Sequence, residues 1–309
     1  MNHTINAEEK FDIVYTWVDN SDPQYKTTHD SFKKKWLKTN AWDEEIVGEM
    51  RDRNNDELKF SLRAAEKFAP WANRVFLLTF GQYPEWMNFD HPKLTIARHT
   101  DILPDSFLPT FNSFALEWAL HRIPGLSENF IYFNDDYFLG QPTLTRDFYS
   151  PENGHMLSFD YDPKNYQKKM NPWRASMKNA NQCLEERFGK RFRRSQLHLP
   201  HFFRKSVFKE MAKEFAHEAN HTMSHKFRDY NDVNATQMYM HYIIDMNYPH
   251  TIEREPGFTF HYLSRESIEK ILKTRPKFYC LNDVTEDRDN YKLFLMLERL
   301  YPDKSSFEN

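Results

Sequence analysis

The stretch NFIYFNDDYFLG, residues 129–140, places two adjacent carboxylates, Asp135 and Asp136, directly after a run of apolar and aromatic residues. A short apolar run bounded by polar residues is typical of a strand that is buried on both faces of a parallel sheet. Open α/β sheets bind their ligands at the carboxyl ends of such strands. The stretch therefore predicts a buried strand whose end presents two carboxylates to a ligand.

The residues before this stretch alternate between strand and helix patterns. Segments rich in β-branched and aromatic residues predict strands over 11–18, 74–79 and 94–97. Apolar residues at helical spacing behind a capping residue predict helices over 56–69 and 110–122. This order favours an α/β fold with a mostly parallel, Rossmann-like sheet and covering helices.

The second half of the chain is more polar and less periodic. Three helices are predicted there, over 208–220, 233–246 and 268–273. The polar segment 160–195 is predicted to be an insertion that runs over the surface or acts as a lid. We expect a single domain over residues 1–309, with its core sheet at about 10–150 and further site segments at about 196–285.

Composition and charge limit the classes of function. Lys and Arg number 42 against 45 Asp and Glu, so the net charge of −3 gives no broad attraction to polyanions, and nucleic acid is not the expected partner. Cys183 and Cys280 are the only cysteines, too few for a disulfide framework or a thiolate zinc site, which favours a reducing compartment. The sequence contains no signal-peptide pattern and no apolar run of membrane-spanning length. We therefore expect a cytoplasmic protein that at most contacts the inner face of the cell membrane.

The aspartate pair suits a divalent metal. Hard carboxylate oxygens are preferred ligands of Mg²⁺ and Mn²⁺, and a nucleotide-sugar enzyme uses such a pair to hold the metal against the diphosphate of its donor. Asp19 and Asp22 follow another predicted strand, and parallel strands would bring both acidic clusters to the same edge of the sheet. The alternative interpretation is a solvated turn or a helix cap.

A second cluster, HLPHFFR at residues 198–204, contains His198, His201 and Arg204. Two histidines near an arginine in a polar region are able to supply a base and a phosphate contact. Zinc binding is the rival interpretation. It has less support, because the spacing does not match a helical histidine pair and no cysteine is near in the sequence.

Two basic segments are further candidates for contact with phosphate. SHKFR, residues 224–228, is either an exposed basic turn or a cationic contact that includes Arg228. The cluster KRFRR, residues 190–194, is either a solvated face or a contact with phosphate or with an anionic lipid surface.

The chain resembles the Stealth proteins, a family that includes bacterial capsule hexose-1-phosphate transferases and the animal N-acetylglucosamine-1-phosphotransferase. Four blocks carry the resemblance, and a further similar segment lies between the last two. In chain order the five are FDIVYTWVDNSDP (11–23), the long block from RNNDELKFSLR to IYFNDDYFLG (53–140), HLPHFFRK (198–205), SHKFRDYNDVNATQMYMHY (224–242) and KFYCLND (277–283). Because they span nearly the whole chain in order, chance similarity to one short motif does not explain them.

The resemblance implies a fold like that of nucleotide-sugar transferases. It also implies transfer of a hexose-1-phosphate, or an N-acetylhexosamine-1-phosphate, from a UDP-sugar to a saccharide hydroxyl. UMP would leave and a phosphodiester would form in a capsule or other cell-surface polysaccharide, with a lipid-linked oligosaccharide or a growing polysaccharide as acceptor. Because the acceptor attacks phosphorus, catalysis needs in-line positioning, charge neutralisation and a proton acceptor.

The resemblance also assigns the catalytic roles to residues in the blocks. Asp135 and Asp136 are expected to bind Mg²⁺ or Mn²⁺, and Asp136 is counted among the catalytic residues. His198 is the expected general base, because a neutral imidazole suits proton removal near neutral pH, and His201 is the alternative.

Arginines are expected to stabilise the phosphoryl oxygens, because a forked guanidinium binds them better than lysine does. Arg228 is the first candidate, and Arg63 and Arg204 are weaker ones. The other candidates for substrate contact lie in the same blocks: Tyr15, Thr16, Trp17, Asp19, Asp22, Asn112, Ser113, Asn282 and Asp283. Two other classes of function stay open, namely a metal-dependent glycosyltransferase that releases UDP and a non-catalytic carbohydrate-binding protein.

Overall fold

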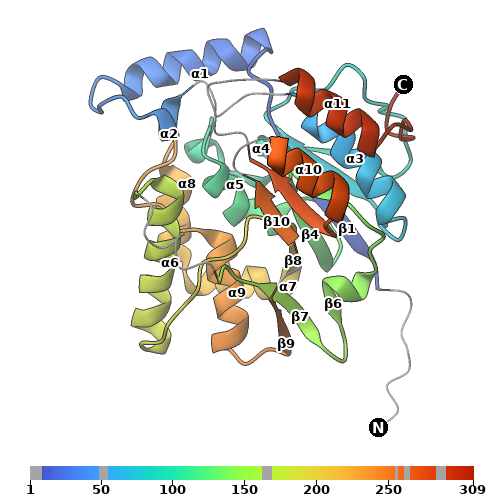
Figure 1. Cartoon of the computed structure of the whole chain (residues 1–309). Coiled ribbons are helices and arrows are strands. Elements are labelled where there is room, and N and C mark those ends of the chain that lie inside the picture. The colour runs from blue at the N-terminus through green and yellow to red at the C-terminus, as the bar shows by residue number, and fades with distance from the viewer. Residues whose placement is uncertain (1–8, 49–54, 162–168, 255–256, 261–264, 283–289) are drawn as a thin grey trace.

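The computed structural model describes residues 9–48, 55–161, 169–254, 257–260, 265–282 and 290–309. Four parallel strands form most of its central sheet: β1 (Phe11–Trp17), β2 (Val75–Thr79), β3 (Leu94–Arg98) and β4 (Asn129–Asn134). A fifth strand, β8 (His201–Arg204), runs antiparallel to β4. The strand order is β3-β2-β1-β4-β8. Figure 1 labels β1, β4 and β8 of this sheet. The mostly parallel sheet predicted from the sequence is confirmed.

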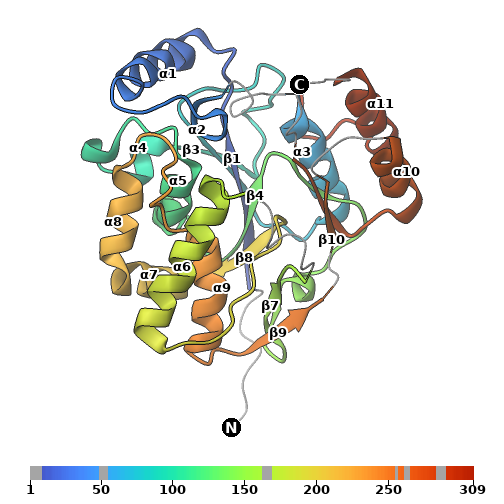
Figure 2. The ribbon, with the colours of Figure 1, turned by 60° about the vertical axis from the view of Figure 1, so that its left-hand side comes forward.

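Helices cover both faces of this sheet (Figure 2). One face carries α3 (Glu57–Phe68), α10 (Arg265–Thr274) and α11 (Asn290–Leu300). The other carries α5 (Ser113–Ala119), α7 (Lys205–Glu214), α8 (Ala216–Ser224) and α9 (Ala235–Asp245). Successive strand residues point to opposite faces, so Ile13 and Tyr15 of β1 pack against the first group while Val14 packs against the second. The sheet therefore separates two hydrophobic cores.

Two small sheets complete the strand pairing. One consists of β10 (Gly257–Phe260), β11 (Phe278–Leu281) and β5 (Tyr137–Leu139), in that order. The other consists of β6 (Tyr149–Ser150), β7 (Gly154–Ser158) and β9 (His250–Glu253). β11 is antiparallel to β5, with Cys280 opposite Tyr137. This pairing brings a segment from near the C-terminus beside the turn that carries the aspartate pair.

The predicted helices are present, with two differences. The helix predicted over 110–122 begins at Ser113, because the Asn112 side chain caps it by accepting a hydrogen bond from the Phe114 backbone at 3.0 Å. The helix predicted over 208–220 is two helices, α7 and α8, because the backbone of Phe215 between them is not helical (φ −103°, ψ 41°).

Several helices were not predicted from the sequence. Three of them lie in the first third of the chain: α1 (Pro23–Trp36), α2 (Glu44–Val47) and α4 (His99–Ile102). A fourth, α6 (Pro172–Phe188), lies inside the polar segment 160–195 and packs against α9, where Ala180 and Leu184 are fully buried. Its buried face is narrow, so its apolar residues are few and their helical period is weak.

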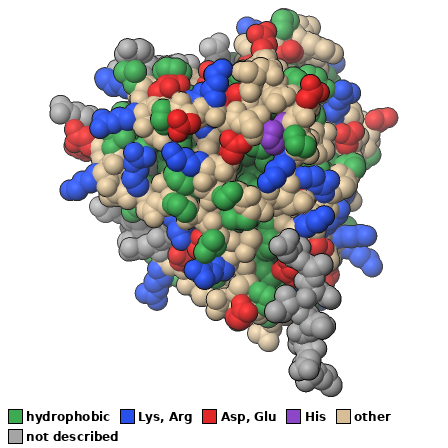
Figure 3. All heavy atoms as spheres, turned by 90° about the vertical axis from the view of Figure 1, so that its right-hand side faces the viewer, with side chains coloured by type: hydrophobic (Ala, Val, Ile, Leu, Met, Phe, Trp, Pro, Cys, Tyr) green, Lys and Arg blue, Asp and Glu red, His purple; other side chains and the backbone are tan. Residues whose placement is uncertain are grey.

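One face of the molecule carries charged side chains of both signs (Figure 3). Basic and acidic side chains are interspersed on the face shown in Figure 3, so that face presents no large area of one charge sign. Within the described residues, every helix is too short or too polar to traverse a lipid bilayer.

Candidate active site

The carboxyl ends of β1 and β4 lie side by side. The two strands pair in the register that sets Thr16 opposite Asn134. Asp19 follows β1 and the pair Asp135 and Asp136 follows β4, so both acidic clusters lie at one edge of the sheet, as predicted. Ligands of open α/β sheets bind at this edge.

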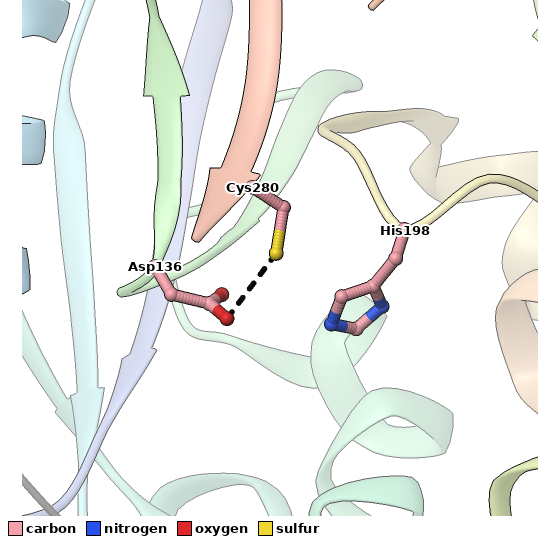
Figure 4. Close-up of side chains that lie close together, drawn as sticks. All are labelled: Asp136, His198 and Cys280. Carbon is pink, nitrogen blue, oxygen red and sulfur yellow. Dashed lines mark hydrogen bonds between the residues drawn. The ribbon is translucent and has the colours of Figure 1, made fainter. Parts of the chain in front are cut away.

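The aspartate pair occupies a two-residue turn between β4 and β5. The backbone N–H of Leu281 donates to the carbonyl oxygen of Asp136 at 3.0 Å. The thiol of Cys280 donates to Asp136 Oδ2 at 3.3 Å (Figure 4). β11 therefore fixes both the backbone and the side chain of Asp136.

A third carboxylate, Glu57, acts on the aspartate pair. It is the first residue of α3, it is 5% exposed, and its two oxygens accept hydrogen bonds from the backbone and side-chain nitrogens of Asn55, both at 2.6 Å. Burial raises the pKa of Glu57 to about 7, and the charge of Asp136 adds to the rise. Burial, followed by the charges of Asp136 and Glu57, raises the pKa of Asp135 well above its usual range.

These three carboxylates carry negative charges that act on one another. Their oxygens are ligands that Mg²⁺ and Mn²⁺ prefer, and a bound cation would offset the repulsion among Glu57, Asp135 and Asp136. Sequence reasoning missed Glu57, because a glutamate in the first turn of a helix ordinarily serves to complement the helix dipole.

His198 lies beside Asp136 and Cys280, at the end of the loop that leads to β8 (Figure 4). One ligand atom from each of the three residues lies within 4.8 Å of the other two. A hydrogen bond of 3.1 Å joins His198 Nδ1 to the hydroxyl of Tyr137, and Trp173 packs edge-on against the imidazole with ring centroids 6.1 Å apart. The ring is therefore oriented by its neighbours and held next to the aspartate pair.

His201, the other histidine of the same block, is buried on the edge strand of the central sheet. It is the first residue of β8, opposite Tyr132 of β4, and it is 6% exposed. Burial lowers the pKa of His201 to about 3. Of the two candidate bases, the geometry favours His198.

Arg228 converges on the same region from the segment after α8. Its Nη2 donates to Ser113 Oγ at 2.7 Å, and its guanidinium lies 4.5 Å from the centroid of the Phe114 ring. Burial raises the pKa of Glu117 to about 7, and the charge of Arg228 opposes that rise. Burial also raises the pKa of Tyr132, and Glu117, Arg228 and Asp135 all act on that hydroxyl. Arg228 therefore contacts the N-terminal end of α5, and its charge acts on Tyr132, two residues before the end of β4.

Hydroxyl groups join the ends of β1 and β4. The Tyr132 hydroxyl donates to Asn134 Oδ1 at 2.6 Å, and Thr16 Oγ1 donates to the same oxygen at 3.3 Å. This network fixes the strand ends immediately before the aspartate turn. Thr16 thus supports the site from the neighbouring strand.

Two regions of the chain match models of one protein family. The model described as Stealth protein CR2, conserved region 2, matches residues 51–157, and the model described as Stealth protein CR3, conserved region 3, matches residues 197–245. Together the two matches take in about half of the chain and contain the aspartate pair, His198 and Arg228. The chain belongs to the Stealth family.

Curated relatives of this Stealth chain include proteins named exopolysaccharide phosphotransferases. One from Streptomyces coelicolor is 34% identical over 317 residues, which cover 96% of this chain and 51% of the relative. CpsY of Mycobacterium tuberculosis is 34% identical over 322 residues, which cover 99% of this chain and 59% of the relative. The chain thus spans about half the length of the curated relatives it matches.

Solved structures resemble the Stealth chain more distantly. A galactosyltransferase, LgtC, determined with donor and acceptor sugar analogues, has a TM-score of 0.48 at 10% identity and covers 96% of this chain and 98% of its own. Mouse xyloside xylosyltransferase 1 has a TM-score of 0.38 at 10% identity. The match covers 90% of this chain and 99% of the mouse protein's chain. Both scores are below 0.5, so these likenesses decide nothing about function.

Three predicted substrate contacts of this Stealth chain are enclosed in its cores. Tyr15 and Trp17 are 0% and 4% exposed, and the Tyr15 hydroxyl shares a 2.8 Å hydrogen bond with Ser61 Oγ. Asn112 is fully buried and donates from Nδ2 to Asp232 at 2.9 Å, in addition to capping α5. Because solvent does not reach these side chains, we assign them to the scaffold rather than to substrate.

The two weaker arginine candidates lie away from the aspartate turn. Arg63 forms a buried ion pair with Glu308, in which two nitrogens each lie 2.8 Å from the carboxylate oxygens, and it also donates to the Tyr301 carbonyl at 2.9 Å. Arg204 is opposite Asn129, the first residue of β4, which is the far end of that strand. Neither position supports the predicted contact with phosphoryl oxygens.

The loop aspartates and the last block complete the predicted set. Asp22 Oδ1 caps α1 by accepting from the Tyr25 backbone at 2.7 Å, and Asp19 Oδ1 accepts from the Ser21 backbone at 2.8 Å. Their oxygens therefore shape the loop at the site edge. Asn282 is half-buried directly after β11, whereas Asp283 lies outside the described residues.

Replacing Arg63 by methionine tests its assignment to the scaffold. We expect a loss of about 3–5 kcal/mol in the free energy of unfolding, because Glu308 would be left as a buried, unpaired carboxylate. Lys67→Met, on the same helix and half exposed, is the control and should change stability by less than about 0.5 kcal/mol. Denaturant unfolding measures both. Unchanged stability with lost affinity for UDP-sugars would return Arg63 to the substrate site.

Proposed function

We propose that this chain transfers a hexose-1-phosphate, or an N-acetylhexosamine-1-phosphate, from a UDP-sugar to a saccharide hydroxyl and releases UMP. The observation that carries the proposal is the convergence of an acidic turn, an oriented histidine and a half-buried arginine at one sheet edge. These are the groups that phosphoryl transfer needs for cation binding, proton removal and charge stabilisation. The printed names of the relatives, exopolysaccharide phosphotransferases, agree with this class of reaction.

In the proposed reaction the acceptor oxygen attacks the phosphorus that is bonded to the sugar. A bond forms between that oxygen and phosphorus while the bond from phosphorus to the UMP oxygen breaks, and UMP carries away the bonding electrons. The acceptor proton passes to His198. Its hydrogen bond with Tyr137 orients the imidazole, so the nitrogen that takes the proton keeps a fixed direction.

Two groups of side chains would offset the negative charge of the donor diphosphate. When bound, Mg²⁺ or Mn²⁺ would neutralise the donor diphosphate, and Glu57, Asp135 and Asp136 are the residues that would hold it. Arg228 supplies a positive charge, and its guanidinium is held by Ser113 and the Phe114 ring. A fixed guanidinium stabilises phosphoryl oxygens without reorganising during the reaction.

The acceptor and the place of the reaction belong to the same proposal. We propose a growing polysaccharide or a lipid-linked oligosaccharide as acceptor, in the cytoplasm and at the inner face of the membrane when the acceptor carries lipid. The basic cluster 190–194 gives that membrane contact little support. Arg191 and Arg193 both pair with Asp245, at 2.6 Å and 3.0 Å, and so hold the fold rather than face a lipid surface.

The nucleotide product tests the proposed function. The chain would be incubated with a panel of UDP-sugars and saccharide acceptors, and the released nucleotide separated by chromatography. UMP in proportion to product is the expected result. Stoichiometric UDP would instead identify a glycosyltransferase, and binding of saccharides without any nucleotide release would identify a carbohydrate-binding protein.

Removal of divalent metal is expected to stop turnover. Without a cation the carboxylates of Glu57, Asp135 and Asp136 repel the donor diphosphate, so excess EDTA should reduce activity to background. Added Mg²⁺ or Mn²⁺ should restore it, and a melting curve in EDTA serves as the control for folding. Full turnover in excess chelator would remove the metal role from these carboxylates.

A further inference from the structure

Asp136, His198 and Cys280 come from three separate elements: the turn after β4, the loop before β8, and β11 (Figure 4). Each offers one ligand atom, and these atoms all lie within 4.8 Å of one another. The sulfur of Cys280 is 3.3 Å from Asp136 Oδ2. In a tetrahedral zinc centre, with bonds of about 2.3 Å to sulfur and 2.0 Å to oxygen, those two ligands lie about 3.5 Å apart. The carboxylate and the thiol thus already have the separation that such a centre needs.

The chemistry of this set differs from that of the three carboxylates beside it. Thiolate sulfur and imidazole nitrogen are soft or intermediate ligands, which bind Zn²⁺ and Co²⁺ strongly and Mg²⁺ poorly. Carboxylate oxygens alone favour Mg²⁺ or Mn²⁺. Asp136 is common to both sets. A cation held by one set therefore competes for that carboxylate with a cation held by the other.

Charge and orientation also suit the set. A divalent cation bound to the Asp136 carboxylate, a Cys280 thiolate and a neutral His198 imidazole gives a centre of zero net charge, which a partly buried position tolerates better than a lone charge. Cys280 is fully buried and Asp136 is half-buried. The Tyr137 hydroxyl bonds the imidazole at 3.1 Å, as outer groups do around ligating histidines.

We propose that Asp136, His198 and Cys280 form a binding site for a zinc-class cation, Zn²⁺ or Co²⁺, and that its occupation blocks turnover. On binding, the metal–sulfur bond replaces the S–H bond of Cys280 and one proton leaves to solvent. The statement that the bound cation blocks turnover, the blocking half of the inference, rests on the proposed function. That function uses Asp136 to hold the catalytic metal and His198 to accept the acceptor proton. The binding half does not depend on any activity of the chain.

Cobalt binding tests the site directly. The full chain would be freed of metal with a chelator, passed into buffer and titrated with Co²⁺ while its absorption spectrum is recorded. We expect about one Co²⁺ per chain, visible bands of tetrahedral Co²⁺, and a sulfur-to-cobalt charge-transfer band in the near ultraviolet that Zn²⁺ abolishes by displacement. Absence of that charge-transfer band in excess Co²⁺ would overturn the proposal.

The two cysteines provide a matched pair of variants. Cys280→Ser should lose the charge-transfer band, whereas Cys183→Ser, on α6, should keep it. A band that persists in Cys280→Ser would overturn the proposal. His198→Ala should weaken Co²⁺ binding by more than about 100-fold. Removing a group that only hydrogen-bonds a metal ligand costs up to about 100-fold in affinity, and removing the ligand itself should cost more. Circular dichroism and melting curves exclude unfolding as the cause, and His198→Ala with unchanged Co²⁺ affinity would exclude the imidazole as a ligand.

Turnover tests the blocking half. At constant Mg²⁺, Zn²⁺ should stop activity over the same concentration range in which it displaces Co²⁺, and excess EDTA followed by Mg²⁺ should restore it. Zn²⁺ that displaces Co²⁺ yet leaves turnover intact would overturn the blocking half alone. A chain that shows the cobalt spectrum but no phosphotransfer would contradict the proposed function and keep the metal site.

Discussion

Replacing His198 by alanine is expected to lower turnover by about 10²- to 10⁴-fold, the usual worth of a positioned general base. The imidazole is oriented by the Tyr137 hydroxyl and lies beside Asp136, where the donor diphosphate would be held. Donor affinity should change little, because the carboxylate-bound cation and Arg228 hold the donor. Steady-state kinetics and UDP-sugar binding by calorimetry measure the two effects separately.

His201→Ala is the matched control for this experiment. His201 is enclosed in β8 and 6% exposed, so its truncation should reduce the free energy of unfolding by about 1–3 kcal/mol and leave most of the turnover of the folded protein. Near-normal turnover in His198→Ala, together with a large loss of turnover in His201→Ala, would show that His201 is the general base and His198 a structural residue.

Replacing Arg228 by alanine is expected to lower turnover by about 10²- to 10³-fold, the effect of removing one fixed group that stabilises developing charge. Its guanidinium donates to Ser113 and stacks on Phe114, so it is held in place before substrate arrives. Arg228→Lys keeps the charge and loses the planar fork, and it should recover only part of the rate.

Arg204→Ala is the control for the arginine prediction. Arg204 lies at the opposite end of β4 and makes a partly exposed contact of 3.5 Å with Glu128. Its loss should therefore leave turnover within about twofold and stability within about 1 kcal/mol. Equal losses of turnover in Arg204→Ala and Arg228→Ala would show that turnover depends on the net charge of the protein and not on a specific contact of Arg228 in the site.

The sequence predicts the sheet well because its signal is local. The run before Asp135 is apolar on both faces, and a strand covered by helices on both sides requires that pattern. Helix α6 was not predicted, because its local signal is weak. It buries only a few small and apolar residues, among them Ala180 and Leu184, so its periodicity is weak although its packing is close.

The same difference between local and tertiary information applies to the predicted site residues. The aspartate turn is a candidate from the sequence alone, because carboxylates at the end of a buried parallel strand lie where such sheets bind ligands. Tyr15 and Trp17 share one face of β1, and only the packing of α3 on that face shows that they are enclosed. The sequence does not show that Glu308, near the C-terminus, lies beside Arg63 and pairs with it.

Two further groups in the site carry no local signal. Glu57 is distinguished from other first-turn glutamates only by its burial near Asp135 and Asp136. Cys280 lies in the last block, and no spacing rule joins it to His198. The pairing of β11 with β5 brings the two together. Tertiary structure therefore adds a third carboxylate and a thiol to the candidate site that the sequence predicts.

The fate of the phosphorus next to the sugar tests the central claim most directly. A UDP-sugar labelled with ³²P in that phosphate would be incubated with the chain, with and without saccharide acceptors. The account predicts label in the saccharide product, or in free sugar-1-phosphate when water is the acceptor, together with unlabelled UMP. Label recovered in UDP, with an unlabelled saccharide or free sugar, would contradict it.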